Sequence, residues 1–357
     1  MTADSRPRVS ILLPAYNAEN YLQEALDDLL HQTFSDFELV AVDDGSTDAT
    51  LEIFERAANE DPRVVVLSGE PNRGLSTALN RGLARCRAPL VARADADDRY
   101  AAERLERQVR FLDAHPEVGL LSCAAQRMTE DAVPLGVARF PTEDGPIRLR
   151  ELFVNSFCSP GVVFRTDLVR ELGGFDPAYR FGEDGDMWDR LRQVTKAANL
   201  PEVLVHYRIL ASSLTRSTMS ERERQGPVVR RRALARYLER PVSLEEAESM
   251  VTTFHARRES MGTASQLRVG LAGMQEVLSR ASVREDAATV AYFRRACALA
   301  LLQHADFRRD REPASAWQLY VRALRWWPRL AASRRGLGQA RRCASSTAHR
   351  LLPIGGR

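Results

Sequence analysis

Apolar and polar positions change their period repeatedly along the first third of the chain. Short apolar runs, which are typical of buried strands, occur at residues 9–16, 38–44, 64–67, 90–94 and 118–125. Between these runs, apolar residues recur at helical spacing over residues 18–32, 47–58, 75–85 and 101–114. Repeated strand–helix units of about 25–30 residues build parallel sheets with right-handed crossovers. We therefore predict an α/β domain with a mainly parallel sheet flanked by helices.

The second half of the chain has a different pattern. Residues 159–164 and 203–208 still have the pattern of strands, but from residue 228 onward the apolar spacing is helical. A polar stretch before this point ends in Gly226-Pro227, which predicts a linker. We expect a first domain at 1–215, a linker at 216–227 and an all-α region at 228–357. Its helices are expected at 228–239, 244–259, 264–280, 285–304 and 313–325.

The net charge of +3 conceals an asymmetry between these parts. Residues 1–220 contain 25 Lys and Arg against 35 Asp and Glu, a balance of −10, whereas residues 221–357 contain 26 against 13, a balance of +13. Such a difference between halves predicts two modules with different partners.

The cysteines and the apolar runs indicate in which cellular compartment the protein is expected. The five cysteines are scattered and never form a C-x-x-C pair, which favours free thiols in a reducing cytosol over disulfides or a structural zinc. Residues 1–8 have no apolar core of a signal peptide, and no run approaches the ~18 residues of a membrane span. We expect a cytoplasmic protein.

Polar clusters follow three of the predicted strands, at Tyr16-Asn17, Asp43-Asp44 and residues 95–98. In parallel sheets, ligands bind beyond the carboxyl ends of the strands. The last cluster, Asp-Ala-Asp-Asp, supplies hard oxygen ligands that suit Mg²⁺ or Mn²⁺ bound to substrate phosphates. An isolated match of this kind is equally well explained as a solvated turn. No G-x-G-x-x-G or Walker A motif is present.

Several ordered motifs then resemble one family. They read V-S-I-L-L-P-A-Y-N (9–17), F-E-L-V-A-V-D-D-G-S-T-D (37–48), N-R-G-L-S (72–76), D-A-D-D (95–98), G-G-F-D (173–176) and E-D-G-D-M-W (183–188). Over residues 8–216 the chain resembles the family 2 glycosyltransferases. The resemblance implies the GT-A fold of nucleotide-diphospho-sugar transferases, with a Rossmann-like sheet, and transfer with inversion at the anomeric carbon.

The resemblance also implies a binding site for a nucleotide-sugar donor. Pro14, Ala15 and Tyr16 would form a wall of the nucleoside pocket. Asp44 would bind the uracil edge, or another base in its place, and Arg81 would contact the diphosphate.

Three further carboxylates would serve the reaction itself. Asp95 would hold ribose or sugar hydroxyls, Asp97 would bind Mn²⁺ or Mg²⁺, and Asp184 would be the catalytic base. An acceptor hydroxyl is too weak an acid to ionise at neutral pH, so a carboxylate within hydrogen-bonding reach must take its proton. Without the resemblance, residues 183–186 would be interpreted as the acidic first turn of a helix. Trp188 is expected in the core.

The chain departs from the family pattern at one place. Members often have Tyr-Arg-x-His after the last strand, with the histidine near the metal or the diphosphate, whereas this chain has Tyr-Arg-Ile-Leu at 207–210. His206 is expected to be a core residue. The pattern from Arg322 to Trp326 only superficially resembles the Gln-x-x-Arg-Trp motif of processive members, which favours transfer of single residues.

The C-terminal stretch 313–357 has nine arginines, no acidic residue and three tryptophans. Arginine with interfacial aromatic residues suits an anionic membrane surface, so this tail would bring the enzyme to a carbohydrate or lipid-linked acceptor at the inner face of the membrane. A solvated helix packed on the acidic domain explains the composition equally well. No nucleic-acid-reading motif is present.

Two alternatives for the whole protein stay open. A sugar-1-phosphate nucleotidyltransferase shares the α/β layout but needs a glycine-rich, basic N-terminal loop, which residues 12–16 do not provide. A catalytically degenerate nucleotide-sugar-binding scaffold would not need the intact carboxylates that we expect in the site. We expect an enzyme of cell-surface polysaccharide or glycoconjugate synthesis.

Overall fold

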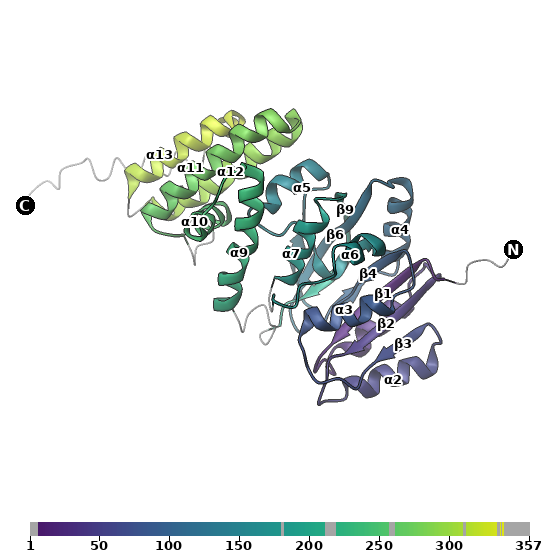
Figure 1. Cartoon of the computed structure of the whole chain (residues 1–357). Coiled ribbons are helices and arrows are strands. Elements are labelled where there is room, and N and C mark those ends of the chain that lie inside the picture. Colours follow the sequence, from purple (N-terminus) through teal and green to yellow (C-terminus); the bar gives the residue numbers. More distant parts are fainter. Residues whose placement is uncertain are drawn as a thin grey trace, which may run out of the picture. The chain divides into compact units, whose positions relative to one another are not determined.

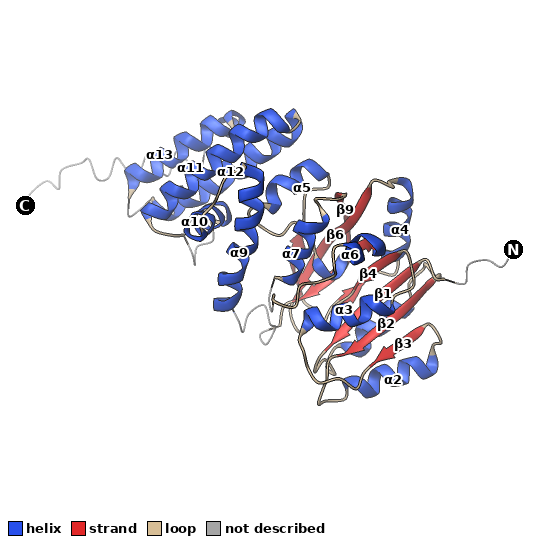
Figure 2. Ribbon diagram, viewed as in Figure 1, coloured by secondary structure: helices blue, strands red, loops and turns tan. Residues whose placement is uncertain are grey.

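The computed structural model describes residues 6–179, 182–210, 219–256, 261–309, 312–333, 336 and 338 (Figure 1). The chain divides into two compact units. The sheet unit comprises Met1–Ile147 and Ser156–Gly226, and the helical unit comprises Arg148–Asn155 and Pro227–Arg357. Within the described residues, one sheet of nine strands belongs to the first unit and a set of helices to the second (Figure 2).

The strands of the sheet follow the order β3-β2-β1-β4-β8-β6-β9-β5, and β7 pairs with β6. Their bounds are β1 Val9–Ala15, β2 Phe37–Asp43, β3 Val64–Leu67, β4 Leu90–Arg93, β5 Arg99–Tyr100, β6 Val118–Met128, β7 Pro134–Ala138, β8 Val163–Arg165 and β9 Lys196–Arg208. The predicted α/β class is confirmed. The apolar pattern identified strands but not their directions, and the sheet is mixed.

The half of the sheet formed by β3, β2, β1 and β4 is parallel, as is the pair β6–β9. In contrast, β8 runs antiparallel to both of its neighbours, β4 and β6, and β5 and β7 are antiparallel to their partners. The parallel half is therefore the part in which the carboxyl ends of consecutive strands meet at one edge.

Helices cover both faces of this sheet because each strand presents alternate residues to opposite sides. Ile11 and Leu13 of β1 belong to one apolar cluster together with residues of α1, α2 and α4, whereas Leu12 belongs to a second cluster with residues of α3, α6 and α7. The bounds are α1 Leu22–Leu30, α2 Thr50–Glu60, α3 Leu75–Arg85, α4 Arg104–Ala114, α5 Asp144–Glu151, η1 Ser159–Gly161, α6 Thr166–Glu171 and α7 Glu183–Leu191.

The helical unit confirms the predicted pattern of helices, with shifts of up to four residues at most ends, but α9 begins at Met219, nine residues before the predicted start and within the predicted linker. Its elements are α9 Met219–Leu238, α10 Leu244–His255, α11 Ala264–Arg284, α12 Ala287–Arg308, α13 Pro313–Trp326 and η3 Pro328–Ala332. Side-chain caps start three of them, because Ser243, Thr263 and Asp286 each accept a backbone N–H of the first turn. No helix in the described ranges is both long and apolar enough to cross a bilayer.

The region predicted as a linker is only partly described by the structure, and the described part is helical. Residues 216–218 lie outside the described residues, and residues 219–227 form the first turns of α9. The basic tail is also divided, since most of residues 334–357 lie outside the described part of the chain.

A short segment from the middle of the chain, Arg148–Asn155, belongs to the helical unit. Leu149, Leu152 and Phe153 of this segment share an apolar cluster with residues of α9, α10, α11 and α12. The chain thus leaves the sheet unit within α5 and returns to it before η1.

Candidate active site

The strand register brings two acidic clusters to one edge of the sheet. β1 lies between β2 and β4, with Ala15 opposite Asp43 and Leu12 opposite Arg93. The backbone N–H of Asp44 donates to the carbonyl of Ala15 at 2.9 Å. The predicted cluster at 43–44 and the loop that follows β4, residues 95–98, therefore flank the end of β1. We call residues 95–98 the acidic loop.

Asp44 organises the loop that precedes α3. Its carboxylate oxygens accept the backbone N–H groups of Arg73 at 3.2 Å and of Gly74 at 2.8 Å, and the residue is buried. Gly45, with a φ of +77°, permits the close approach of this loop, since a Cβ there would lie 2.6 Å from the backbone nitrogen of Asn72. Asp44 thus directly supports the loop that carries the N-R-G-L-S motif, residues 72–76.

The predicted nucleoside wall lies at the end of β1. Pro14 and Ala15 are the last residues of this buried strand, and the side chain of Tyr16 is half exposed just beyond it. Arg81 lies on α3, where its Nη2 donates to the carbonyl of Ser68 at 3.4 Å and its Nη1 is buried without a hydrogen-bond partner. That unpaired N–H group is a free donor beside the β3–α3 loop.

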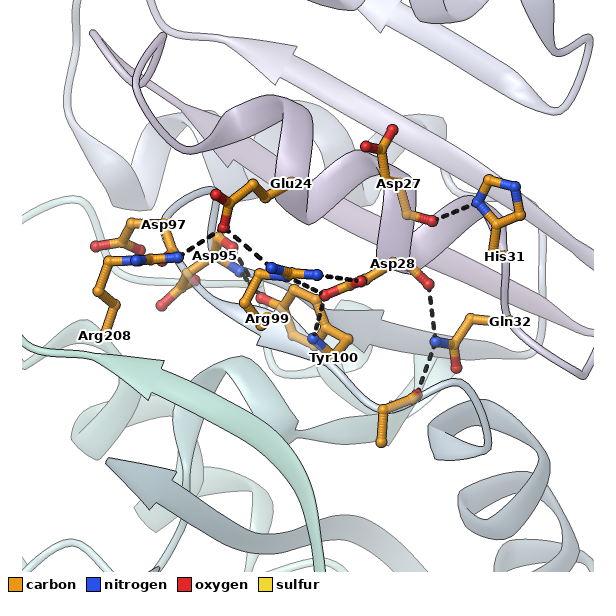
Figure 3. A network of polar contacts seen from close by, with 11 residues as sticks. Glu24, Asp27, Asp28, His31, Gln32, Asp95, Asp97, Arg99, Tyr100 and Arg208 are labelled. Atoms are coloured by element: carbon orange, nitrogen blue, oxygen red, sulfur yellow. Dashed lines mark hydrogen bonds and ion pairs between the residues drawn. The ribbon is translucent and has the colours of Figure 1, made fainter. Parts of the chain in front are cut away.

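Helix α1 fixes the acidic loop and the strand that follows it (Figure 3). The carboxylate of Asp28 accepts two hydrogen bonds from the Arg99 guanidinium, at 2.6 and 3.0 Å, and one from the backbone N–H of Tyr100 at 2.9 Å. The Tyr100 hydroxyl accepts the backbone N–H of Asp95 at 2.7 Å and donates to the Asp95 carbonyl at 2.8 Å. These contacts hold the backbone at Asp95 in place.

Arg208, at the end of β9, fixes the other side of the acidic loop (Figure 3). Its backbone N–H donates to the Asp98 carboxylate at 2.7 Å, and its Nε donates to the Asp97 carbonyl at 2.9 Å. Its Nη2 reaches the Glu24 carboxylate at 2.9 Å. The arginine of the Tyr-Arg-Ile-Leu sequence is therefore a buried support of the loop. His206, two residues earlier, is half-buried and not a core residue as expected; it lies opposite Arg99 in the register of β5 and β9.

Asp184 lies in the first turn of α7, behind Gly182, whose φ of +78° lets the chain enter the helix. The Ser159 hydroxyl of η1 donates to Asp184 Oδ2 at 2.5 Å, and the backbone N–H of Gly185 donates to Oδ1 at 2.7 Å. The carboxylate therefore lies at the N-terminal end of α7 and accepts at least these two hydrogen bonds. The sequence analysis missed Ser159, although it stands in a strand-like run directly after a buried segment.

Arg93 connects the acidic loop to α7. This buried arginine ends β4, and its Nε lies 3.2 Å from Asp95 Oδ1 while its Nη1 lies 3.4 Å from Glu183 Oε1. Burial alone lowers the pKa of Arg93, but the carboxylates of Asp95, Glu183 and Asp184 outweigh it and raise the pKa. The sequence analysis did not select Arg93; a lone arginine that interrupts an apolar strand directly before an acidic cluster is the signal that identifies it.

The acidic loop fits a divalent cation. Burial, together with the neighbouring Asp95 carboxylate, raises the pKa of Asp97 to about 6, and burial raises that of Asp98 well above its usual value. Asp98 Oδ2 is buried without a hydrogen-bond partner. A cation would relieve this concentration of charge. No group of three or more His, Cys, Asp or Glu side chains in the described ranges is placed to hold a metal by itself.

Glu183, next to Asp184, is a buried carboxyl group. Burial and the adjacent Asp184 carboxylate raise the pKa of Glu183 to about 7, against the opposing effect of Arg93. Trp188, one turn further along α7, is fully buried among Phe157, Phe164 and Phe175, which confirms that it is a core residue.

The sheet order, with the acidic ends of β2 and β4 and the arginine that connects β4 to α7, defines an α/β protein with a polar candidate site at one edge of the sheet. The model of the family "Glycosyl transferase family 2" matches residues 10–171. The amylovoran biosynthesis glycosyltransferase AmsE of Erwinia amylovora is 36% identical over 203 residues, which are 56% of this chain and 75% of that protein. An uncharacterized glycosyltransferase of Haemophilus influenzae is 26% identical over 266 residues, 71% of this chain and 82% of that protein. The chain belongs to the family 2 glycosyltransferases.

Solved structures confirm the GT-A fold. S. aureus TarS 1–349, in complex with UDP-GlcNAc, matches with a TM-score of 0.57 at 20% identity over 89% of this chain and 91% of that one. The mannosyltransferase PcManGT from Pyrobaculum calidifontis, in complex with GDP-Man and Mn²⁺, matches with a TM-score of 0.53 at 21% identity over 90% and 88%.

Proposed function

We propose that this glycosyltransferase moves a sugar from a nucleotide-diphosphate sugar, a UDP-sugar in the simplest case, to a hydroxyl of a carbohydrate or lipid-linked acceptor with inversion. The observation that carries the proposal is the position of Arg93. It connects Asp95 of the acidic loop with Glu183, and Glu183 immediately precedes Asp184. Donor-binding and base-bearing elements are thereby held by one buried cation.

The chain's own residues supply most of the binding. Pro14, Ala15 and Tyr16 form the wall on which the nucleoside lies, and the half-exposed Tyr16 ring offers it a face. Asp44 accepts from the base edge with the lone pairs that its two backbone donors leave free. Arg81 supplies its unpaired Nη1–H as a donor to the diphosphate.

Asp95 accepts hydroxyl protons of the ribose or the transferred sugar, and Asp97 is the protein ligand of Mn²⁺ or Mg²⁺. When bound, this cation supplies Lewis-acid stabilisation of the charge on the departing diphosphate. Asp97 would share the coordination with phosphate oxygens and water, since the histidine of the family pattern is absent.

Asp184 takes the proton of the acceptor hydroxyl as the new C–O bond forms. Ser159 and the backbone N–H of Gly185 orient the carboxylate for this transfer. A hydroxyl oxygen that displaces the diphosphate directly from the opposite face inverts the anomeric centre.

The names of relatives support the biological setting. AmsE is named for amylovoran biosynthesis, and this chain is 36% identical to it over 203 residues. We infer a role in the synthesis of a cell-surface polysaccharide or glycoconjugate, by a cytoplasmic enzyme that acts at the inner face of the membrane.

A screen of UDP-, GDP- and dTDP-sugars by nucleotide release, with Mn²⁺ or Mg²⁺, tests the proposal. Asp184→Asn should bind the identified donor normally and transfer its sugar at least about 100-fold more slowly. Asp167→Asn on the neighbouring α6 removes an exposed carboxylate and serves as the matched control. Transfer by Asp184→Asn at a rate close to wild type would refute the assignment of the base.

A further inference from the structure

A hollow of about 910 Å³ lies wholly within the helical unit. It is formed where the end of α11, the first turns of α12 and the α13–η3 junction come together. Its lining residues are Ser282, Glu285, Ala287, Val290, Ala291, Tyr292, Arg294, Arg295, Trp326, Trp327, Pro328 and Arg329. A hollow of this size accommodates several sugar rings of a chain rather than a single ion.

Aromatic rings form part of its wall in fixed orientations. Trp326 is half-buried, and its Nε1–H donates to the side-chain oxygen of Gln275 at 2.9 Å. The guanidinium of Arg295 lies 5.2 Å from the centre of the Trp327 ring. The guanidinium of Arg295 covers one face of Trp327, so this ring offers at most its other face, whereas Trp326 is fixed through its Nε1–H. A ring that is held in this way loses little conformational entropy on binding, and its apolar face suits the apolar side of a sugar ring.

The charged groups of the hollow are unbalanced. Arg294, Arg295 and Arg329 have exposed side chains, whereas the acidic residue in the lining, Glu285, has Arg148 at 3.9 Å. Guanidinium groups bind carboxylates and phosphates through paired N–H donors. The hollow thus combines an excess of anion-binding groups with aromatic faces.

The shape of this site favours a carbohydrate chain over a bilayer. Membrane-binding surfaces insert protruding aromatic side chains, but Trp326 and Trp327 are half-buried in the wall of a concavity. We propose that the hollow binds an acidic carbohydrate chain, one that bears carboxylate or phosphate groups. This ligand would be the acceptor or the product of the glycosyl transfer, so that its identity rests on the function proposed above.

The test measures binding by tryptophan fluorescence and calorimetry with the full-length protein. The probes are hexagalacturonate, maltohexaose carrying a 6-phosphate, neutral maltohexaose, and vesicles of anionic phospholipid. We expect the wild type to bind at least one acidic oligosaccharide, and the double variant Arg294→Gln/Arg329→Gln to bind it at least tenfold more weakly. The two acidic probes distinguish recognition of carboxylate from recognition of phosphate.

A double variant with the same net charge is the control. Arg268→Gln/Arg322→Gln removes two exposed arginines of α11 and α13 that do not line the hollow, and its affinity should stay within twofold of wild type. Equal loss in both double variants, equally tight binding of neutral maltohexaose, or loss of vesicle binding alone in the Arg294/Arg329 variant would overturn the proposal.

Donor turnover without acceptor separates this inference from the proposed function. We expect both double variants to release nucleotide at the wild-type rate, because none of these arginines belongs to the sheet unit. If no nucleotide sugar is turned over by the wild type while arginine-dependent oligosaccharide binding is observed, the proposed function fails and the assignment of the hollow stands.

Discussion

The carboxylate of Asp184 is contacted by a hydroxyl from another element. Ser159 is a side-chain donor to Asp184 Oδ2, at 2.5 Å, and it lies 25 residues away in sequence. A carboxylate that acts as a base must be aimed at its substrate, and one hydrogen bond of this kind restricts its rotation. For the base proposed above, Ser159 would therefore be a positioning residue.

Removal of this hydroxyl should affect the chemical step more than binding. We expect Ser159→Ala to lower kcat by about tenfold, with the donor KM changed less than twofold, because the contact acts only on the base. Ser159→Thr, which keeps the hydroxyl, should recover most of the activity. Steady-state kinetics of both variants checks this; an unchanged kcat in Ser159→Ala would contradict it.

His304 in α12 is a buried residue whose environment disfavours the protonated, charged form of the imidazole. Its Nε2–H donates to the Thr253 carbonyl at 3.0 Å, and Arg308 faces Nδ1 at 3.3 Å. Burial, together with the Arg308 charge, lowers the pKa of His304 to about 4.

The unfolded chain therefore binds a proton at this site between about pH 6.5 and 4 that the native state does not bind, and stability falls as the pH falls through that range. The loss attributable to His304 is at most about 3 kcal/mol. Chemical denaturation between pH 7 and 4 should show this slope in the wild type and a smaller one in His304→Gln, with the exposed His31→Gln as control. An identical slope in wild type and His304→Gln would show that the histidine does not contribute.

At the scale of elements, helix α1 holds the acidic loop in position. One face of the helix is buried through Leu22, Leu26 and Leu29, and Asp28 lies at the margin of that face. From there it accepts hydrogen bonds from Arg99 and from the backbone of Tyr100. The apolar face thus fixes the position of a polar residue that in turn holds the loop.

Asp28→Asn should weaken the contacts of α1 with Arg99 and the backbone of Tyr100. We expect a loss of stability of about 1–3 kcal/mol and an increase in the donor KM, since the charge-assisted contacts to Arg99 are lost. Asp27→Asn, one residue earlier and exposed, is the matched control and should have neither effect. Thermal unfolding and donor titration measure the two quantities. If both variants behave alike, α1 does not set the geometry of the loop.

At the scale of the whole molecule, the helical unit is not a simple appendage at the end of the chain. The segment Arg148–Asn155 interrupts the sheet unit and contributes Leu149, Leu152 and Phe153 to the core of the helical unit. The Phe153 ring stacks on Phe254 and Phe293, at centroid distances of 4.6 and 5.5 Å.

A chain that ends at residue 227 should therefore expose three apolar side chains. We expect it to be largely insoluble, or to bind a hydrophobic dye, and we expect Leu149→Ser/Phe153→Ser within the truncated chain to improve its solubility. In the full-length chain, Phe153→Ala should lower stability by about 3–5 kcal/mol. A truncated chain that is monomeric and binds no dye would contradict this interpretation of the segment.

The charge asymmetry also belongs to this scale. The acidic residues of the first half include Asp44, Asp95, Asp97 and Asp184, the carboxylates of the proposed donor and base sites. The basic residues of the second half include the arginines of the hollow in the helical unit. The small net charge thus results from two modules of opposite sign.

The sequence by itself determined the strand and helix pattern, because burial imposes a period of two on strands and about 3.6 on helices. It also determined the family and the motif carboxylates, since these are local in sequence. Strand direction, the membership of segment 148–155 in the helical core, and the contacts of Arg93, Ser159 and Arg208 were decided only by the tertiary structure. These contacts join residues far apart in the chain. The period of apolar residues predicts which face of an element is buried, but it does not predict which distant residue a side chain will contact. The hollow lined by Trp326, Trp327 and three arginines is likewise a product of packing, because its walls come from helices whose sequences each indicate only an exposed, basic face.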